Sequence, residues 1–578
     1  MNTNVSKWSV LAINPGHNGS AALVVDGELL FYAEEERFSR SKYDANPFRA
    51  MLHVLINHTV DELVIGGAEE QFARLPWTGE NAYASLARKF NPNLKVTMMN
   101  HLHHLGHAAT AFYNSGFETA AAVVVDGAGS VHREQVGENG PTVAGYETET
   151  IYQCAYPNEF SAVYKRYSDG ANGMHYDNGI QEFDSATTIT KAYEAVTDYL
   201  GFGFIEAGKT MGLAPYGQED NNFPPFFING KGNKNLLLPR YPAGATIDED
   251  RFPYLKRFGD PREWHNDFTL VRDQDKNLAF RIQKETEMQM MELIQKAIDT
   301  TGETNIVMSG GFALNCVANY KYIRAFPNIK FYIDPIAHDG GTAIGLALHA
   351  SHMQSSDTTI RPLKSVYLSS PPNYDQLSIA EQNTRGISVT DTTADAIADL
   401  IDQGNIVALF QGQAEGGPRA LGNRSILFDP RRQDGKEIVN RVKHREWFRP
   451  FAGTVMAEHA ADWFEMANLE SSPFMMYAVD VKADKVAQIP AVTHVDNTCR
   501  VQTVSREQNE KYYDLIDAFY RKTGMPVLFN TSFNLAGQPL VDSVFDSLVT
   551  LFNSDIQYIY MPDIGKLVTK LPPDETNV

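Results

Sequence analysis

The sequence predicts an α/β protein with at least two domains, and three observations support this. The chain has 578 residues, which is too many for a single hydrophobic core. Short apolar runs alternate with amphipathic segments of helical period, as in proteins whose mostly parallel sheet is covered on both faces. The hydrophobic share of 43% and the charged share of 21% are those of an ordinary globular protein.

Residues 9–37 predict a β-meander of strand, polar turn, strand, Asp-Gly turn and strand. The first turn presents His17, Asn18 and Ser20. A meander followed by alternating helices and strands is how the fold of actin, the sugar kinases and the heat-shock ATPases begins. The expected alternation is helix 47–58, strand 61–65, helix 81–90 and strand 94–98.

The next stretch, residues 101–107, holds four of the chain's 16 histidines. In a helix, His103 and His107 lie one turn apart on one face and can share a cation. Asp126 and Asp339 each follow an apolar strand and precede glycines. Two imidazoles and two carboxylates suit Fe, Mn or Zn, and the residue types do not choose among them. The alternative is a set of surface histidines at a helix start.

Between these acids, residues 127–185 lack clear periodicity and predict substrate-shaping loops, and residues 218–265 predict an excursion from the domain. Residues 206–217 predict a glycine-spaced loop, which we do not interpret as a P-loop although Gly203, Gly208, Lys209 and Thr210 have the spacing GxxxxGK followed by Thr. A long helix is expected at 278–299. Residues 305–319 predict a strand, a glycine turn and a helix start that could receive a nucleotide phosphate or ribose.

The polar, Ser-rich stretch after a helix at 340–352 predicts a linker, and we place the boundary between domains 1–360 and 361–578 there. A helix near 392–403 and a strand at 405–410 begin a second α/β unit. Basic and polar side chains then recur beside glycines and strand ends: Arg419, Arg424, Lys443, Arg449, Arg500, Asn530 and Ser532. Arginine forks and hydroxyls of this kind predict an oxyanion pocket, the alternative being solvated surface charges.

Charge and composition limit the partners. With 50 Lys and Arg against 71 Asp and Glu, the net charge of −21 would repel duplex nucleic acid. No secretory signal or long apolar run is present, so we expect a cytoplasmic protein without membrane contact. Three widely spaced cysteines do not predict a disulfide framework. A homodimer is the default expectation.

Several motifs together resemble the O-carbamoyltransferase family of NodU, CmcH and TobZ. They are His-x-x-x-His, Met-Gly-Leu-Ala-Pro-Tyr-Gly, Gly-Gly-x-Ala-Leu-Asn-Cys, Gly-Pro-Arg-Ala-Leu-Gly-Asn-Arg-Ser and Phe-Asn-Thr-Ser-Phe-Asn, spread over nearly the whole chain. The resemblance implies an actin-like (ASKHA) N-terminal domain similar to the threonylcarbamoyl-transferase domain. It also implies a YrdC-like C-terminal domain that forms carbamoyl-adenylate from carbamoyl phosphate and ATP. The N-terminal domain would pass the carbamoyl group to an acceptor hydroxyl.

The resemblance also implies residue roles. A metal, usually iron, would be held by His103, His107, Asp126 and Asp339. The N-terminal nucleotide site would be formed by Lys209, Gly212, Gly310, Gly311 and Asn315. The basic residues of the second half would bind carbamoyl phosphate and ATP, with Mg²⁺ accompanying ATP.

His17 lies in a segment that matches the family's His-Asp-Ala-Ser-Ala-Ala-Leu pattern, and we expect it to be the general base. Asn18 replaces the family's Asp, so the group that orients His17 is left open. Lys42 would stabilise the developing oxyanion.

The acceptor is not specified by the sequence. A small natural product, a sugar or a hydroxymethyl-pyrimidine nucleotide fits the charge better than hydroxymethylated DNA does. A sugar kinase or ATPase of the actin-like fold would explain the meander and glycine turns, but not the histidine pair or the basic second half. A binding module that responds to ATP, with a structural metal, is the non-enzymatic alternative.

Overall fold

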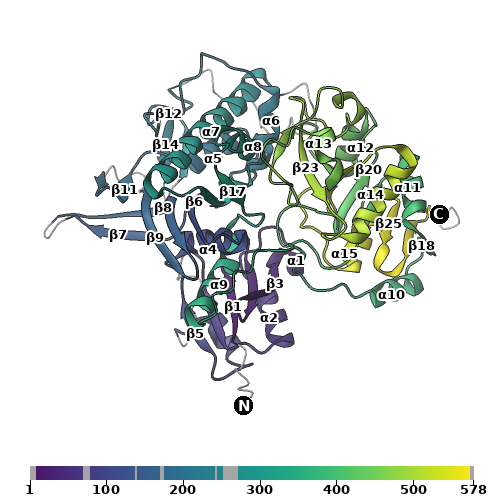
Figure 1. The fold of residues 1–578 in the computed structure, drawn as a ribbon, viewed down its shortest axis with the longest axis horizontal. Coiled ribbons are helices and arrows are strands. Elements are labelled where there is room, and N and C mark those ends of the chain that lie inside the picture. Colours follow the sequence, from purple (N-terminus) through teal and green to yellow (C-terminus); the bar gives the residue numbers. More distant parts are fainter. Residues whose placement is uncertain are drawn as a thin grey trace. The chain divides into compact units, whose positions relative to one another are not determined.

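The computed structural model describes residues 8–68, 79–136, 140–168, 175–240, 244–251 and 271–572. The expected excursion at 218–265 lies outside these residues from 252 onward. The chain forms two compact units, the first comprising Met1–Ser39 and Tyr43–Lys364, the second Arg40–Lys42 and Ser365–Val578. Both units combine strands and helices, so the α/β prediction is confirmed (Figure 1). No helix of the described residues is long and apolar enough to cross a membrane.

The first sheet of the N-terminal unit has the strand order β3-β2-β1-β4-β5. Its strands are β1 (Ser9–Asn14), β2 (Ser20–Val25), β3 (Glu28–Glu34), β4 (Glu62–Ile65) and β5 (Lys95–Met98). The first three pair in antiparallel fashion, which confirms the meander, and β4 and β5 continue the sheet in parallel. Helices α1 (Glu35–Ser39), α2 (Phe48–Asn57) and α3 (Ala82–Ala87) follow the expected alternation. One face of the sheet packs against α2 and α3.

The second sheet repeats this order. Its strands are β6 (Thr119–Val125), β7 (Val131–Gln135), β8 (Thr142–Ala155), β9 (Glu159–Ser168), β10 (Tyr176–Asp177), β11 (Gln181–Asp184), β16 (Asn305–Ser309) and β17 (Lys330–Ile333). The segment β9-β8-β6-β16-β17 has three antiparallel strands followed by two parallel ones, as in the first sheet. This doubled arrangement agrees with the actin-like prediction. Strands also occupy much of 127–185, where we expected loops.

The remaining elements of this unit are α4 (His103–Ser115), α5 (Ile189–Tyr199), α6 (Ala207–Leu213), α7 (Asp273–Thr301), α8 (Cys316–Ala325), α9 (Thr342–Gln354) and the hairpins β12–β13 (Phe227–Ile228, Lys231–Gly232) and β14–β15 (Leu237–Arg240, Gly244–Ile247). The loop expected at 206–217 is wrong, since α6 and a 3₁₀ turn (Ala214–Tyr216) occupy it. Gly217 follows this turn, and a Cβ atom there would lie 2.1 Å from the Lys276 carbonyl oxygen, so the close approach requires glycine.

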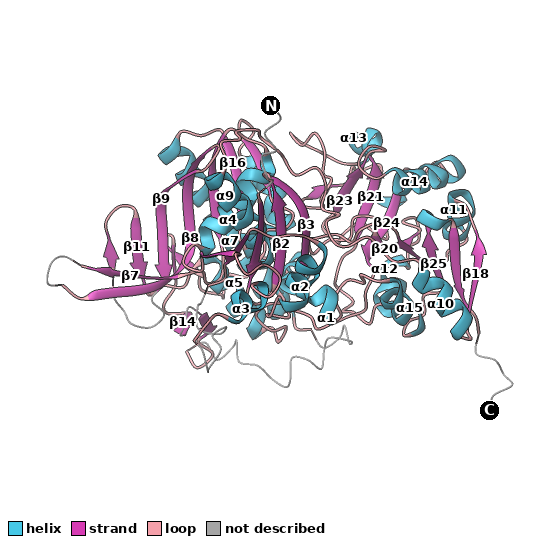
Figure 2. Ribbon diagram, turned by 90° about the horizontal axis from the view of Figure 1, so that it is seen from below, coloured by secondary structure: helices cyan, strands magenta, loops and turns pink. Residues whose placement is uncertain are grey.

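Helices α4 and α9 lie between the two sheets, and each follows the last strand of one repeat (Figure 2). Helix α4 contacts β6 and β16, whereas α9 contacts β1 and β2. Two glycines allow the helices to touch. A Cβ atom on Gly345 would lie 2.1 Å from the Gly106 carbonyl oxygen, and one on Gly106 would lie 3.1 Å from Cβ of Thr342. Three of the predicted metal ligands lie at the N-terminal ends of these helices: His103 and His107 in α4, and Asp339 just before α9.

The C-terminal unit is built on a nine-stranded sheet of order β18-β26-β25-β19-β20-β24-β21-β23-β22. Its strands are β18 (Ile387–Asp391), β19 (Val407–Phe410), β20 (Arg424–Phe428), β21 (Ala452–Met456), β22 (Ala478–Asp480), β23 (Thr498–Val504), β24 (Val527–Ser532), β25 (Tyr558–Met561) and β26 (Lys566–Lys570). The helices are α10 (Asp375–Asn383), α11 (Ala394–Asp402), α12 (Gly435–Val442), α13 (Ala460–Trp463), α14 (Glu510–Thr523) and α15 (Val544–Phe552). Helices α10 and α15 pack on β19, β25 and β26 in one core.

Candidate functional site

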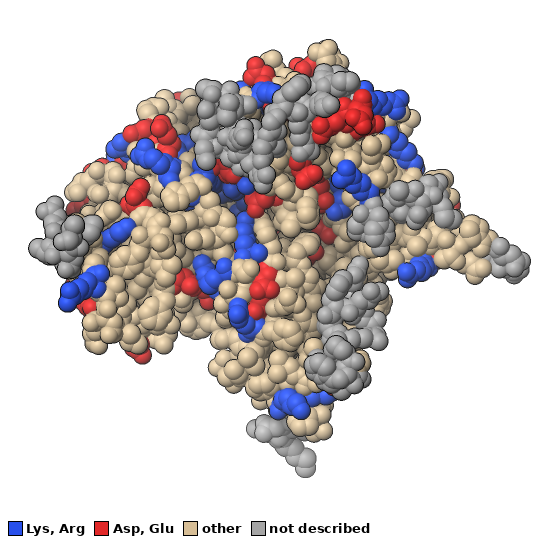
Figure 3. All heavy atoms as spheres, turned by 180° about the vertical axis from the view of Figure 1, so that it is seen from behind, with Lys and Arg blue, Asp and Glu red and all other residues tan. Residues whose placement is uncertain are grey.

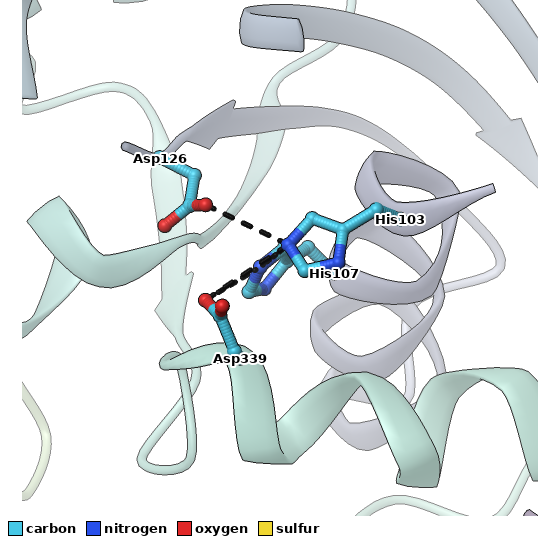
Figure 4. Close-up of side chains that lie close together, drawn as sticks. All are labelled: His103, His107, Asp126 and Asp339. Carbon is cyan, nitrogen blue, oxygen red and sulfur yellow. Dashed lines mark hydrogen bonds and ion pairs between the residues drawn. The ribbon is translucent and has the colours of Figure 1, made fainter. Parts of the chain in front are cut away.

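Four side chains from three separate segments converge in the N-terminal unit (Figure 4). His103 and His107 project from the first two turns of α4. Asp126 directly follows β6, and Asp339 begins the 3₁₀ turn before α9. One potential ligand atom from each lies within 4.8 Å of the others. The structure thus brings together the four residues that the sequence proposed as metal ligands.

The distances in this cluster fit a bound cation. The two Nε2 atoms of His103 and His107 lie 3.2 Å apart. Nε2 of His103 lies 3.6 Å from Asp126, and Nε2 of His107 lies 3.7 Å from Asp339. Ligands bound tetrahedrally to one ion at about 2.1 Å are themselves separated by roughly 3.4 Å. Two imidazole nitrogens this close repel each other unless a proton or a metal ion lies between them.

The electrostatics of the cluster also favour a cation. Burial alone would lower the pKa of His103, but Asp126 and Asp339 raise it to about 9. Burial would raise the pKa of Asp126, yet the neighbouring histidines hold it well below its usual range. The carboxylates therefore stay ionised in a buried site, a state that a divalent ion stabilises. Ser309 Oγ lies 3.2 Å from Nδ1 of His107, which leaves Nε2 to face the centre.

His17 lies at the exposed rim of this cluster. Its Nε2 is 3.3 Å from Asp339, and 54% of its side chain is exposed. Its Nδ1 lies 3.5 Å from Oδ1 of Asn18, whose Nδ2 donates to Glu34 at 3.0 Å. Asp339 raises the pKa of His17. The structure thus gives His17 one partner on each nitrogen, and Asn18 is itself one of them.

The predicted nucleotide residues fall into two groups. The turn at Gly310 and Gly311 lies against the metal cluster, because the Gly311 amide donates to Asp126 at 3.0 Å. Gly310 has φ of +91°, and a Cβ atom there would lie 2.3 Å from the Val125 carbonyl oxygen, so only glycine fits. Asn315 caps α8 and also donates to Gln283.

The other group, Lys209 and Gly212, lies in α6. Lys209 Nζ is 3.8 Å from Glu206. Lys42 belongs to the short segment that is part of the second compact unit. The nucleotide role of Lys209 and Gly212 and the oxyanion role of Lys42 stay predictions.

Sequence reasoning missed several residues beside the cluster. Lys191 and Glu194 on α5 form an ion pair of 2.7 Å. A Cβ atom on Gly127, next to Asp126, would lie 2.9 Å from Glu194 and 3.1 Å from Lys191 Nζ. Burial raises the pKa of Glu194, with Asp126 adding to the effect. No motif marks this pair, because α5 is far from Asp126 in sequence.

In the C-terminal unit, predicted anion-binding residues lie at one end of neighbouring strands. Ser425, the residue after Arg424, pairs with Ser532 across β20 and β24. Ala452 on β21 pairs with both Asn530 and Arg500.

Lys443 joins this group by donating to Ser532 Oγ at 3.2 Å and to the Asn534 side chain at 3.0 Å. Burial, Arg445 and Arg449 hold its pKa well below the usual range.

Further basic residues crowd the same region. Burial and Arg445 lower the pKa of Lys436 to about 8. Burial also lowers the pKa of His494 to about 4. The Asp496 carboxylate opposes this shift, whereas the positive charges of Arg500 and Lys436 add to it. Like charges held together in this way are relieved by a bound anion. Lys436, Arg445 and His494 were not among the predicted ligands, although Arg445 lies close in sequence to Lys443 and His494 close to Arg500.

Two predicted ligands have structural contacts. The buried Arg424 guanidinium donates to the carbonyls of Gln411, Asn423 and Asp542 and stacks on Phe410. The buried Asn530 amide donates to the Ala420 carbonyl and to Thr454 and Gln502.

Two further predicted ligands, Arg419 and Arg449, are more accessible. Arg419 is half-buried, and Arg449 lies 3.6 Å from Glu446. Contact of any of these residues with phosphate stays a prediction.

Comparison with known proteins identifies the family to which the chain belongs. Residues 77–348 match the family model described as carbamoyltransferase N-terminus, and residues 398–568 match the one described as carbamoyltransferase C-terminus. Nodulation protein NolNO of Sinorhizobium fredii is 31% identical over 605 residues, covering 96% of this chain and 82% of that protein. Nodulation protein NolO of Bradyrhizobium diazoefficiens is 33% identical over 493 residues, covering 82% of each chain.

The chain therefore belongs to the carbamoyltransferase family, and it is a transferase. Among solved structures, full-length HypF in its phosphate- and nucleotide-bound form is 12% identical with a TM-score of 0.34, over 61% of this chain and 56% of that chain.

Proposed function

We propose that this chain is an ATP-dependent O-carbamoyltransferase that works in two steps. In the C-terminal unit, carbamoyl phosphate loses phosphate to water, and the resulting carbamate oxygen attacks the α-phosphorus of ATP. Pyrophosphate leaves, and carbamoyl-adenylate is formed. In the N-terminal unit, an acceptor hydroxyl attacks the carbonyl carbon of that adenylate. The bond from this carbon to the phosphate oxygen breaks, which gives a carbamate ester and AMP.

The first step is supported by the basic cluster. Lys443, Arg449 and Arg500 come from segments that meet at one end of the sheet, beside Ser532. Carbamoyl phosphate and the ATP phosphates are the anions that such a cluster would bind, with Mg²⁺ accompanying ATP. We assign this unit to the YrdC-like class on the resemblance of its motifs.

The second step rests on a single observation, the placement of His17 at the rim of the four-residue cluster. The Asp339 carboxylate favours a proton on Nε2 of His17, so Nδ1, whose contact with Asn18 is long at 3.5 Å, carries the lone pair that would accept the hydroxyl proton. The imidazolium would then donate to Asp339 from Nε2 and to Asn18 from Nδ1. A divalent metal held by His103, His107, Asp126 and Asp339 would neutralise the phosphoryl oxygens of the adenylate. Iron is our proposed metal, and Mn or Zn suits the same ligands.

The acceptor that we propose is a small hydroxylated molecule, namely a natural product, a sugar or a hydroxymethyl-pyrimidine nucleotide. On the face drawn in Figure 3, basic and acidic side chains are interspersed. The net charge of −21 disfavours duplex DNA as acceptor. A cytoplasmic homodimer completes the proposal.

Product analysis tests this function. The purified protein is incubated with ATP, labelled carbamoyl phosphate and a panel of hydroxylated nucleotides, sugars and antibiotics. A carbamoyltransferase gives AMP and a labelled ester. Release of ADP, with a phosphorylated acceptor, would instead identify a sugar kinase of the actin-like fold. A panel turned over by neither route would leave a binding module whose metal is structural.

A further inference from the structure

A single buried carboxylate, Glu147 on β8, connects two of the three segments that form the metal cluster. Its Oε2 accepts from the backbone amide of Ser130 at 3.2 Å and from that of His104 at 3.4 Å. Ser130 lies in the loop that follows Asp126, and His104 lies in the first turn of α4. Glu147 is 3% exposed.

The backbone of Glu147 strengthens this connection. Its carbonyl accepts from the Gly129 amide at 2.8 Å, and its amide donates to the Ser130 carbonyl at 3.1 Å. A Cβ atom on Gly129 would lie 3.0 Å from Cβ of Glu147 and 2.7 Å from the His104 ring, so this loop passes too closely for a side chain. The loop after Asp126 is therefore held against β8 by both the main chain and the side chain of one residue.

Ser130 extends the connection to His103. Its Oγ accepts from the His103 amide at 3.2 Å and donates to the Asn100 carbonyl at 3.0 Å. The first amides of a helix have no intrahelical partner, and a carboxylate near them is favoured by the helix dipole. Glu147 and Ser130 thus satisfy two of the open amides at the start of α4.

The two ligand histidines differ in the hydrogen bonds that hold their rings in place. Nδ1 of His107 has Ser309 Oγ at 3.2 Å, whereas Nδ1 of His103 has no hydrogen-bond partner among the described residues. A metal-bound histidine usually has its second nitrogen fixed by a hydrogen bond. His103 lacks that support, so its position depends on the backbone of the first turn of α4.

We propose that Glu147 is the positioning residue of the metal centre. It fixes the separation between the His103 backbone and the Asp126 loop, so that both ligands reach one ion without rearrangement. The carboxylate touches neither the metal nor the reacting atoms and acts through Ser130 and the start of α4. Lys165 forms an ion pair with the other carboxylate oxygen of Glu147, Oε1, and so holds Oε2 toward the amides of Ser130 and His104.

Metal titration of the full-length apoprotein tests this inference, which rests on the metal site in the proposed function. Protein stripped with a chelator is titrated with Co²⁺ or Zn²⁺, and affinity is measured by competition with a chelating dye. The Co²⁺ absorption spectrum reports the ligand geometry. We expect Glu147→Gln to weaken binding by roughly 10–100-fold, as loss of supporting interactions around a metal does, and to alter the Co²⁺ spectrum.

Glu149→Gln is the matched control. Glu149 lies on the same strand with the same 3% exposure, pairs with Arg166, and accepts from Ile189 N at the start of α5, a helix without a metal ligand. We expect this variant to lower the melting temperature while keeping the metal affinity and spectrum of the wild type. If Glu147→Gln does not fold, Ser130→Ala removes only the hydroxyl next to the His103 amide and should shift affinity and spectrum in the same direction.

The outcomes separate this inference from the proposed function. If wild-type protein binds no Co²⁺ or Zn²⁺, the metal site and the positioning role both fail. If wild-type protein binds one ion and Glu147→Gln binds it equally with an unchanged spectrum, only the positioning role fails. Equal weakening by Glu149→Gln would also overturn the role, because the effect would then be a general loss of stability.

Discussion

Replacing Gly345 by Ala should damage the N-terminal unit at the point where its two repeats touch. The new Cβ atom would lie 2.1 Å from the Gly106 carbonyl oxygen and 2.5 Å from both the amide and Oγ1 of Thr110. Ordinary contacts of this kind exceed about 3.4 Å, so α4 and α9 must separate by roughly 1 Å. Overpacking against backbone typically costs about 1–3 kcal/mol, and we expect the upper end here.

The same separation should weaken metal binding, because α4 carries His103 and His107 and Asp339 lies just before α9. Urea titration, together with hydrogen exchange of the α4 amides, measures the free energy of unfolding. Competition with a chelating dye measures the affinity for Co²⁺. The control is Gly208→Ala in α6, where no atom lies within 4 Å of the new Cβ atom. It should be neutral or stabilise by up to about 1 kcal/mol through helix propensity. If Gly345→Ala and Gly208→Ala have the same free energy of unfolding, the close contact at Gly345 is not what requires glycine there.

Three other predictions follow from individual side chains. His17→Gln should slow carbamoyl transfer by roughly 10²–10⁴-fold while pyrophosphate release with carbamoyl phosphate continues; loss of both would contradict its role as base. Arg449→Met should raise the KM for carbamoyl phosphate by about tenfold or more, whereas the Arg432→Met control, which removes a surface pair with Asp434, should not. Burial raises the pKa of Glu35 to about 7, so its carboxylate destabilises the fold increasingly as pH rises from about 4.5 through 7. Glu35→Gln should therefore stabilise the protein more at pH 8 than at pH 5, by on the order of 2–3 kcal/mol, and an equal effect at both pH values in thermal melts would contradict this assignment.

Much of the first sheet could be predicted because its apolar runs are short and separated by clear turn residues. Helices α2 and α7 also follow the expected periodicity. Strands β8 and β9 were missed because polar side chains are buried in both, among them Glu147 and Glu149 in β8 and Arg166 in β9, and these hide the alternation. Helix α6 was missed because its two glycines indicate a loop by composition alone.

The doubled strand order has no counterpart in the sequence, where no internal repeat is visible. Topology is set by hydrogen bonds between strands, and different residues can form the same ladder. For the same reason the supports of the site escaped prediction. Glu147, Ser309 and Glu194 reach the cluster from distant segments, and none stands in a motif. His103 and His107 could be predicted because helical spacing places them on one face, and Asp126 and Asp339 because each follows an apolar strand and precedes glycines; the resemblance implied the same four ligands.

The central claim is that one chain makes carbamoyl-adenylate and then consumes it at His17. Mass spectrometry of the His17→Gln protein, incubated with ATP, carbamoyl phosphate and no acceptor, tests this most directly. We predict that carbamoyl-adenylate and pyrophosphate are formed, and that adding wild-type protein with a competent acceptor converts the adenylate to AMP and a carbamate ester. Formation of ADP without any carbamoyl-adenylate would contradict the account.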